Sequence, residues 1–205
     1  SSDLVEVLAA ADVWRTKTGG AFNPLVQSIW QAAAKGFDAS PEMLLSAQSN
    51  VMIGDEIVLP PGARATLNGI AQGHIADRIT ELLRIHGFDN VVIDAGELCI
   101  PGQHRRAVGI PALKSAISVA EVAIATSEPK ALVFDVKTFR HHLIDPKSGQ
   151  SPRYWESISV LAPTAMTADA LSTAFAVMPH EAVADLVPSL PDVAVIGADA
   201  KGRVR

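Results

Sequence analysis

The chain of 205 residues has one cysteine, few aromatic side chains and no long uninterrupted apolar run. Because Cys99 is the only cysteine, an intramolecular disulfide is excluded. Charged residues such as Lys114 and Asp169 break the longest apolar stretches, so the sequence predicts no segment that crosses a bilayer. Hydrophobic residues still make up 48% of the chain and charged residues 19%, a balance typical of a compact globular protein.

The chain also lacks any excess or cluster of basic residues. Lys and Arg number 17 against 22 Asp and Glu, which gives a formal net charge of −5 at pH 7. Proteins that bind nucleic acid or an anionic membrane surface usually present a concentrated positive patch. We therefore expect neither kind of partner. The length allows one large domain or two small ones.

The stretch from Ala162 to Met178 carries the strongest local signal. After Pro163, either Thr164 or Thr167 is expected to cap the N-terminus of a helix. Apolar residues then recur at spacings of three and four, which predicts a buried helical face made of Ala168, Leu171, Ala174, Phe175 and Met178.

On this expected helix, Asp169 and Thr173 stand four residues apart and therefore share one face. A carboxylate and a hydroxyl are hard oxygen ligands of the kind that Mg2+ takes. An Asp near the start of a helix also complements the helix dipole without any metal. The spacing alone leaves both interpretations open.

Residues 65–77, which read A-T-L-N-G-I-A-Q-G-H-I-A-D, place two glycines near the start of another expected helix. Asn68 is expected to cap this helix, and Gly87 to end it. Glycine inside a helix costs about 1 kcal/mol relative to alanine, so Gly69 and Gly73 indicate that something approaches the backbone closely. A phosphate at the helix N-terminus and tight packing against a neighbouring element would each explain them.

Further stretches carry polar residues where expected elements end. Thr18–Pro24 contains two glycines and by itself indicates an ordinary turn. The expected strand within Asn90–Ile100 runs into acidic residues and a glycine, as at a binding site or a hairpin bend. His141 and His142 precede an Asp-Pro to Ser-Gly turn at residues 145–149. Because adjacent extended side chains point to opposite sides, at most one histidine is expected to face a site, as a base or a phosphate-contacting donor.

Taken together, these stretches resemble the FAD:protein FMN transferase family, also called the ApbE or thiamine-biosynthesis lipoprotein family. Thr18–Pro24 resembles its T-G-G-A-F-D-P loop, and Leu67–Asp77 resembles its L-G-G-I-A-K-G-Y-A-V-D helix start. Ile93–Glu97 is similar to its strand ending in A-G-G-D/E. His142–Gly149 resembles H-I-I-D-P-R-T-G, and Ala165–Thr173 resembles A-M-x-A-D-A-L-S-T. The segments occur in the family's order.

The resemblance implies a single α+β domain over residues 1–205, with mixed or antiparallel sheets covered by helices. It implies that Mg2+-bound FAD is cleaved, that FMN is joined to a Ser or Thr of an acceptor protein, and that AMP leaves. The Mg2+ ligands would be the Asp169 carboxylate, the Thr173 hydroxyl and the Gly69 carbonyl. His142 would be the base that deprotonates or positions the acceptor hydroxyl.

The resemblance also assigns flavin contacts to Ala21, Phe22, Asn23 and Leu143, and it associates Thr66 and Gln72 with flavin binding. The ligand is expected in a cleft between the Gly69 helix, the His142 turn and the Asp169 helix.

The chain departs from the family at two of the flavin-binding positions. The family usually has Asp at position 66 and Lys at position 72, where this chain has Thr66 and Gln72. A lysine beside a pyrophosphate makes a charge-assisted contact worth roughly 1.5–3 kcal/mol, which Gln72 does not provide. The match also begins close to Ser1, so the family's N-terminal segment, with further flavin contacts, is expected to be missing.

These departures leave two alternatives to the transferase. One is a non-catalytic flavin- or nucleotide-binding relative, and the other is an FAD pyrophosphatase that releases FMN and AMP. Members of the family act outside the cytoplasmic membrane, often with a lipid anchor, so the resemblance predicts a periplasmic or cell-envelope location.

Overall fold

The computed structural model describes residues 2–49, 51–53 and 57–205, which fold into two compact units. Unit 1 comprises residues 1–67 and 129–153, and unit 2 comprises residues 68–128 and 154–205. Each unit is thus made of two separate segments of the chain. The single domain expected over residues 1–205 stays a prediction.

Unit 2 is built on a five-stranded sheet in the order β11-β10-β7-β4-β3, and every neighbouring pair is antiparallel. The strands are β3 (Ile93–Asp94), β4 (Leu98–Ile100), β7 (Val122–Ser127), β10 (Trp155–Ala162) and β11 (Ala194–Asp199). Strand β10 lies between β11 and β7 and is almost wholly buried, with Ile158 and Val160 completely inaccessible. A short hairpin of β5 (Arg106–Ile110) and β6 (Ser115–Val119), joined through the turn η2 (Pro111–Leu113), packs its apolar side chains into the same core.

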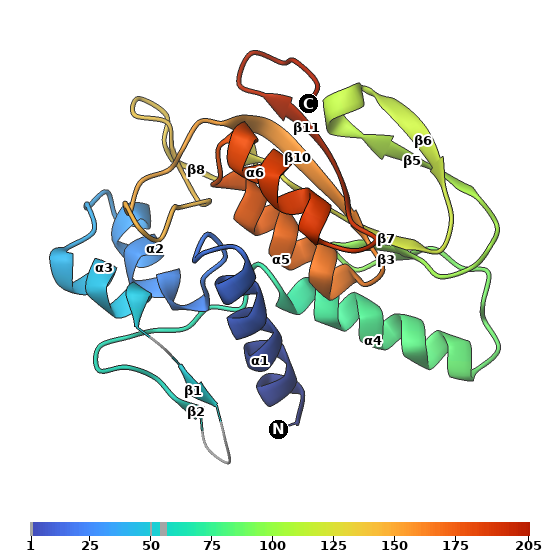
Figure 1. Cartoon of the computed structure of the whole chain (residues 1–205), viewed down its shortest axis with the longest axis horizontal. Helices are drawn as coiled ribbons and strands as arrows, with labels where there is room; N and C mark the ends of the chain where they lie inside the picture. Colours follow the sequence, from blue (N-terminus) through green and yellow to red (C-terminus); the bar gives the residue numbers. More distant parts are fainter. Residues whose placement is uncertain (1, 50, 54–56) are drawn as a thin grey trace. The chain divides into compact units, whose positions relative to one another are not determined.

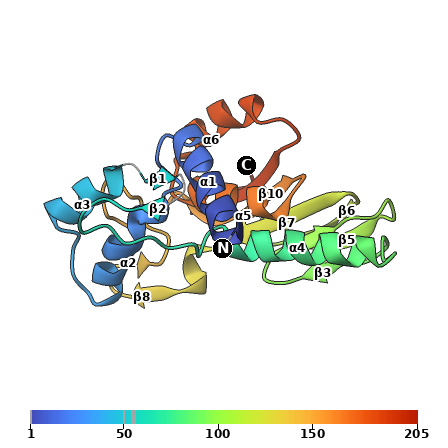
Figure 2. The same ribbon diagram turned by 90° about the horizontal axis from the view of Figure 1, so that it is seen from below.

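Two helices of unit 2 carry the segments that the sequence singled out. Helix α5 (Ala165–Ala176) packs against β7 and β10, and helix α4 (Ala71–Ile85) packs against α5 (Figures 1 and 2). Phe175 and Leu171 of α5 are completely buried, so this helix belongs to the core. After α5 the chain forms α6 (His180–Leu186) and the short turn η4 (Val187–Ser189) before it returns as β11.

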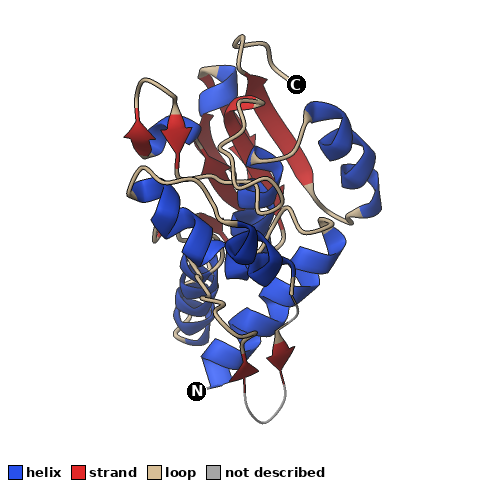
Figure 3. Cartoon of the chain, turned by 90° about the vertical axis from the view of Figure 1, so that its left-hand side faces the viewer, coloured by secondary structure: helices blue, strands red, loops and turns tan. Residues whose placement is uncertain are grey.

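Unit 1 is mainly helical (Figure 3). Its helical elements are α1 (Ser2–Lys17), η1 (Pro24–Val26), α2 (Gln27–Ala34), α3 (Pro41–Gln48) and η3 (Pro129–Ala131). Two short antiparallel ladders complete it, one of β1 (Met52–Ile53) with β2 (Ile57–Val58), the other of β8 (Val133–Asp135) with β9 (Arg140–His141). The core lies between α2, α3 and the segment after β9, where Ile29, Ala47 and Ile144 are buried.

The α+β class is confirmed, and the differences lie at element ends. Thr164 is the N-cap of α5, as predicted, because its hydroxyl accepts a hydrogen bond from the Thr167 N–H at 3.2 Å. Asn68 does not cap α4: the helix begins at Ala71 behind Ile70, without a side-chain cap, because residues 68–70 form a turn. Among the residues described, no helix is both long and apolar enough to span a membrane.

Candidate functional site

In unit 2 the first turn of α4 lies directly against α5. A Cβ added at Gly73 would lie 2.3 Å from the carbonyl oxygen of Ala165, so only glycine permits this backbone approach. The Gly73 N–H donates a hydrogen bond to Oδ2 of Asp169 at 3.0 Å. Of the two explanations for the glycines, tight packing between helices therefore accounts for Gly73. The hydrogen bond from the Gly73 N–H also holds the Asp169 carboxylate in place.

Thr173 lies one turn further along α5, against the other glycine. A Cβ added at Gly69 would lie 2.7 Å from Oγ1 of Thr173. Gly69 is therefore needed if this hydroxyl is to stay close to the main chain that precedes α4. The structure thus brings together the three predicted metal ligands, Gly69 in the turn before α4 and Asp169 and Thr173 on the face of α5 that meets it.

The electrostatics around Asp169 are those of a buried acidic cluster. Burial raises the pKa of Asp169 to about 7, although the Gly73 N–H opposes the shift. Burial, together with the charges of Asp169 and Asp94, raises the pKa of Glu97 to about 8. The negative charge of Asp169 thus disfavours ionisation of the half-buried Glu97, unless the cluster holds a proton or a cation. A divalent cation would relieve both the repulsion and the desolvation cost.

We therefore expect the metal-free protein to lose stability as the pH rises from about 4 towards 8. In the folded protein the pKa of Asp169 is about 7 and that of Glu97 about 8. In the unfolded chain these pKa values are 3.8 and 4.5. The folded state thus binds more protons between these values, and this stabilisation is present at low pH and lost as pH rises through the folded pKa values. Urea unfolding in EDTA at a series of pH values measures the slope.

The matched control for this pH dependence is the double variant Asp169→Asn with Glu97→Gln, which removes both titrating groups. Its stability should fall less steeply over the same pH range. An unchanged slope would show that other groups are responsible.

Gln72 and Gly96 meet beside this cluster. The Nε2 atom of Gln72 would lie 2.6 Å from a Cβ added at Gly96, whose φ is +97°. The neutral amide of Gln72 therefore rests on the bend that leads from β3 to Glu97. Since the Gln72 amide carries no charge, it does not lower the raised pKa of Glu97. A lysine at this position would lower that pKa.

In unit 1 the Thr18–Pro24 loop is held by its own side chains. The Thr18 hydroxyl donates to the Trp14 carbonyl at 2.7 Å and accepts from the Phe22 N–H at 3.0 Å. Asn23 donates from Nδ2 to the Ala47 carbonyl at 2.7 Å, and its Oδ1 accepts from the Leu25 N–H at 2.9 Å. Both polar ends of the Asn23 side chain are thus bound to main chain. The Asn23 side chain therefore holds the loop against α3 and η1.

The other residues of unit 1 predicted to contact the flavin lie around this loop or after β9. Phe22 is buried and Ala21 half-buried, and the Thr66 N–H donates to the Pro24 carbonyl at 2.7 Å. Leu143 is buried in the segment after β9. A cavity of about 270 Å³ opens beside the loop, lined by Arg15, Thr16, Gly19, Gly20, Asn23, Gln48, Pro146 and Lys147.

The two adjacent histidines have different surroundings, as predicted. His141 is completely buried, with Nε2 at 2.9 Å from the Pro152 carbonyl and Nδ1 accepting from the Leu143 N–H at 3.3 Å. His142 has Nδ1 at 3.2 Å from the Leu132 carbonyl, which requires the proton on Nδ1 and leaves a lone pair on Nε2. Burial lowers the pKa of His142, so this imidazole is neutral at pH 7. These are the properties of a general base.

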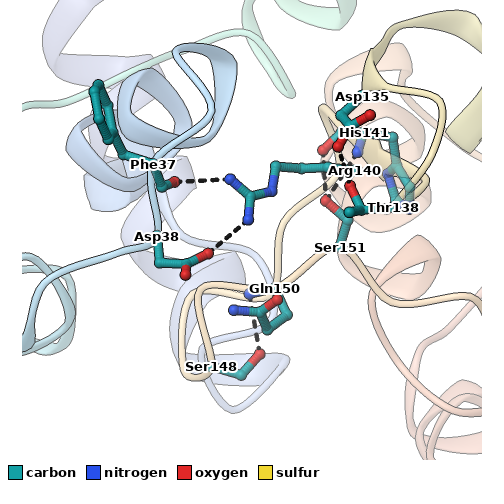
Figure 4. A network of polar contacts seen from close by, with 9 residues as sticks. All are labelled: Phe37, Asp38, Asp135, Thr138, Arg140, His141, Ser148, Gln150 and Ser151. Atoms are coloured by element: carbon teal, nitrogen blue, oxygen red, sulfur yellow. Dashed lines mark hydrogen bonds and ion pairs between the residues drawn. The ribbon is translucent and has the colours of Figure 1, made fainter.

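A polar network holds the strand that precedes His142 (Figure 4). The Ser151 hydroxyl donates to the His141 carbonyl at 2.7 Å and accepts from the His141 N–H at 3.0 Å. Arg140 reaches away from β9 to the Phe37 carbonyl at 3.0 Å and to the Asp38 carboxylate at 2.6 Å, as Figure 4 shows. The main chain that leads into His142 is therefore held at Arg140 and His141.

The predicted turn after His142 is confirmed. The Asp145 carboxylate accepts from the Lys147 N–H at 3.1 Å and from the Ser148 hydroxyl at 2.7 Å. Gly149 closes the turn with φ +71° and an N–H donated to the Asp145 carbonyl at 2.8 Å. The cleft expected to join the residues of the two units stays a prediction.

Comparison with known proteins identifies the family to which the chain is related. A model of the ApbE family matches residues 1–196. The FAD:protein FMN transferase of Treponema pallidum is 30% identical, and the match covers 98% of this chain and 67% of the relative. The FAD:protein FMN transferase of Haemophilus influenzae is 29% identical, with coverage of 87% and 61%. The chain thus spans about two thirds of the curated relatives that it matches.

Solved structures agree on the fold. The crystal structure of the ApbE protein from Thermotoga maritima has a TM-score of 0.86 at 25% identity and covers 100% of this chain and 75% of its own. The flavin transferase ApbE from Vibrio cholerae has a TM-score of 0.74 at 23% identity, with coverage of 97% and 72%. With the family model matching nearly the whole sequence, this chain belongs to the ApbE family.

Proposed function

We propose that the protein is an Mg2+-dependent FAD:protein FMN transferase, which moves FMN from FAD to a Ser or Thr hydroxyl of an acceptor protein and releases AMP. The observation that carries the proposal is the buried Asp169 carboxylate, held by the Gly73 N–H in an acidic cluster beside the Thr173 hydroxyl. The names of the curated relatives support the same activity.

The residues present fit a magnesium ion. Asp169 offers a carboxylate oxygen, Thr173 a hydroxyl and Gly69 a main-chain carbonyl, all hard oxygen donors. The raised pKa values of Asp169 and Glu97 indicate that this cluster is short of positive charge. When bound, Mg2+ supplies charge neutralisation for the FAD diphosphate.

The remaining chemistry falls to the chain's own side chains. His142 Nε2 would take the proton of the acceptor hydroxyl as its oxygen forms a bond to the FMN phosphorus. The bond from that phosphorus to the bridging diphosphate oxygen breaks, and the electron pair leaves with AMP. The Leu132 carbonyl keeps the His142 tautomer correct for this step, because it binds the Nδ1 proton.

The departures at Thr66 and Gln72 bear on flavin affinity in this proposal and leave the metal ligands intact. Gln72 replaces a cation with a neutral amide, so we expect FAD to bind more weakly than in a relative with lysine. By the family resemblance we also propose a periplasmic or cell-envelope location, which cell fractionation tests.

Mass spectrometry separates this function from its alternatives. The protein is incubated with FAD, Mg2+ and an acceptor protein established for a curated relative. We expect the acceptor to gain the mass of FMN on a Ser or Thr while AMP appears. Free FMN with AMP and an unmodified acceptor would identify a pyrophosphatase, and unchanged FAD would identify a binding protein.

A further inference from the structure

The first turn of α5 is tied to α4 by a side chain that has no part in the proposed chemistry. The Asp77 carboxylate of α4 accepts from the Ala165 N–H through Oδ1 at 2.8 Å and from the Met166 N–H through Oδ2 at 2.9 Å. Both oxygens are thus used on consecutive main-chain donors. This is a cap supplied by another helix, since the local cap Thr164 accepts from the next main-chain donor, the Thr167 N–H, and donates to the Thr167 hydroxyl.

Asp77 lies one helical turn after Gly73 on α4, and the two residues make reciprocal bonds to α5. Gly73 donates its N–H to the Asp169 carboxylate, while Asp77 accepts N–H groups from the residues that begin α5. Three hydrogen bonds, one donated by α4 and two accepted by it, fix both the separation and the register of the helices. Gly73 permits the close approach, and Asp77 determines which turn of α5 lies opposite it.

We propose that Asp77 is the positioning residue of the metal site: by holding the start of α5 on α4, it sets where Asp169 and Thr173 lie relative to Gly69. This inference rests on the proposed function, because it assigns the three residues to one cation. Asp77 itself binds main-chain N–H groups with both oxygens and is not a ligand. Its effect on the metal is exerted through the position of α5.

The expected size of the effect follows from metal sites in general. Residues that orient ligands without touching the metal typically change metal affinity by about 10- to 100-fold when they are replaced. Asp77→Ala removes both acceptors. Asp77→Asn keeps one carbonyl oxygen but turns an amide N–H towards the other donor, so it should give a smaller loss and still fold.

The matched control is Thr164→Ala, which removes one acceptor from the same helix end without touching α4. Thr164 and Asp77 both cap α5, so both variants should lower its stability in urea unfolding. Only the Asp77 variants should also move the ligands. The experiment measures the Kd of Mn2+ by electron paramagnetic resonance, with FAD present, for the wild-type chain and the three variants.

We expect Asp77→Ala to raise the Mn2+ Kd at least about tenfold, Asp77→Asn to lie between it and wild type, and Thr164→Ala to stay within about twofold. If Asp77→Ala does not fold, the Asn variant decides the matter. Wild-type affinity in the Asp77 variants, or an equal loss in Thr164→Ala, would overturn the inference. A wild-type chain that binds Mn2+ without transferring FMN would refute the proposed function and leave the role of Asp77 standing, whereas a chain that binds no Mn2+ would refute both.

Discussion

Replacing Asp169 with asparagine is expected to reduce FMN transfer by at least about two to three powers of ten, because a metal ligand typically stabilises transition-state charge by several kcal/mol. The side chain keeps its shape, and one oxygen can still accept from the Gly73 N–H. What is lost is the negative charge that a cation needs. Initial rates at increasing Mg2+ measure the loss, and higher Mg2+ should recover only part of it.

Stability distinguishes this outcome from simple unfolding. The pKa of Asp169 is raised to about 7, so above that pH the wild-type protein without metal carries a poorly compensated buried charge. Asp169→Asn should therefore be at least as stable as wild type at pH 8 in EDTA. Asp94→Asn is the control for charge, because it removes a carboxylate from the exposed edge of the same cluster and should change the rate little. Wild-type rates in Asp169→Asn at ordinary Mg2+ would remove Asp169 from the metal site.

Helix α5 could be predicted closely from the sequence because its signals are local. Its cap at Thr164 and the Asp169–Thr173 spacing lie within a few residues of each other, and the structure has both. The predicted apolar face is confirmed at Ala168, Leu171, Ala174 and Phe175, whereas Met178 lies beyond the end of α5 at Ala176 and is half-buried. The turn at residues 145–149 is predictable for the same reason, since the carboxylate, the proline and the glycine that form it are neighbours.

The sheet of unit 2 could not be predicted in detail because its pairings are remote in sequence. Strand β10 lies between β7 and β11, and each partner is separated from it by a long segment. The strands at the β3 edge of the sheet are short: β3 has only two residues, Ile93–Asp94. Alternation of hydrophobic and polar residues is therefore a weak signal there. The division into two interleaved units likewise depends on tertiary contacts.

The parts of the site that sequence reasoning missed all act through packing. Asp77 lies inside a stretch that the sequence marks, but an Asp on a helix gives no sign that it caps another helix. Asn68 looks like a cap, yet the chain turns at residues 68–70 and α4 starts later. Asn23 stays a predicted flavin contact, and the sequence did not show that its side chain also binds the Ala47 carbonyl and the Leu25 N–H. The local sequence pattern indicates which residues are polar and near a site, but their hydrogen-bond partners become known only from the fold.

Replacing His142 with glutamine is expected to lower the rate of transfer by about 10²- to 10⁴-fold, the usual contribution of a general base. FAD and Mn2+ affinities should change little, because the imidazole supplies a proton acceptor and is not one of the proposed ligands. Glutamine can still donate to the Leu132 carbonyl that fixes His142. It cannot take a proton from a hydroxyl, so the loss should appear in kcat. Stopped assays at saturating FAD and acceptor measure it.

The pH profile of kcat tests whether the loss of rate in His142→Gln is the loss of a general base. Burial lowers the pKa of His142 below its ordinary value of 6.5, so the wild-type rate should rise with pH in the acid range and level off before neutrality. Saturating Mg2+ is needed, because it suppresses the separate titration of the acidic cluster. His141→Gln is the neighbouring control: His141 is buried with both ring nitrogens bound to main chain, so its loss should lower Tm while the acid limb remains. An acid limb that survives in His142→Gln would assign the base to another residue.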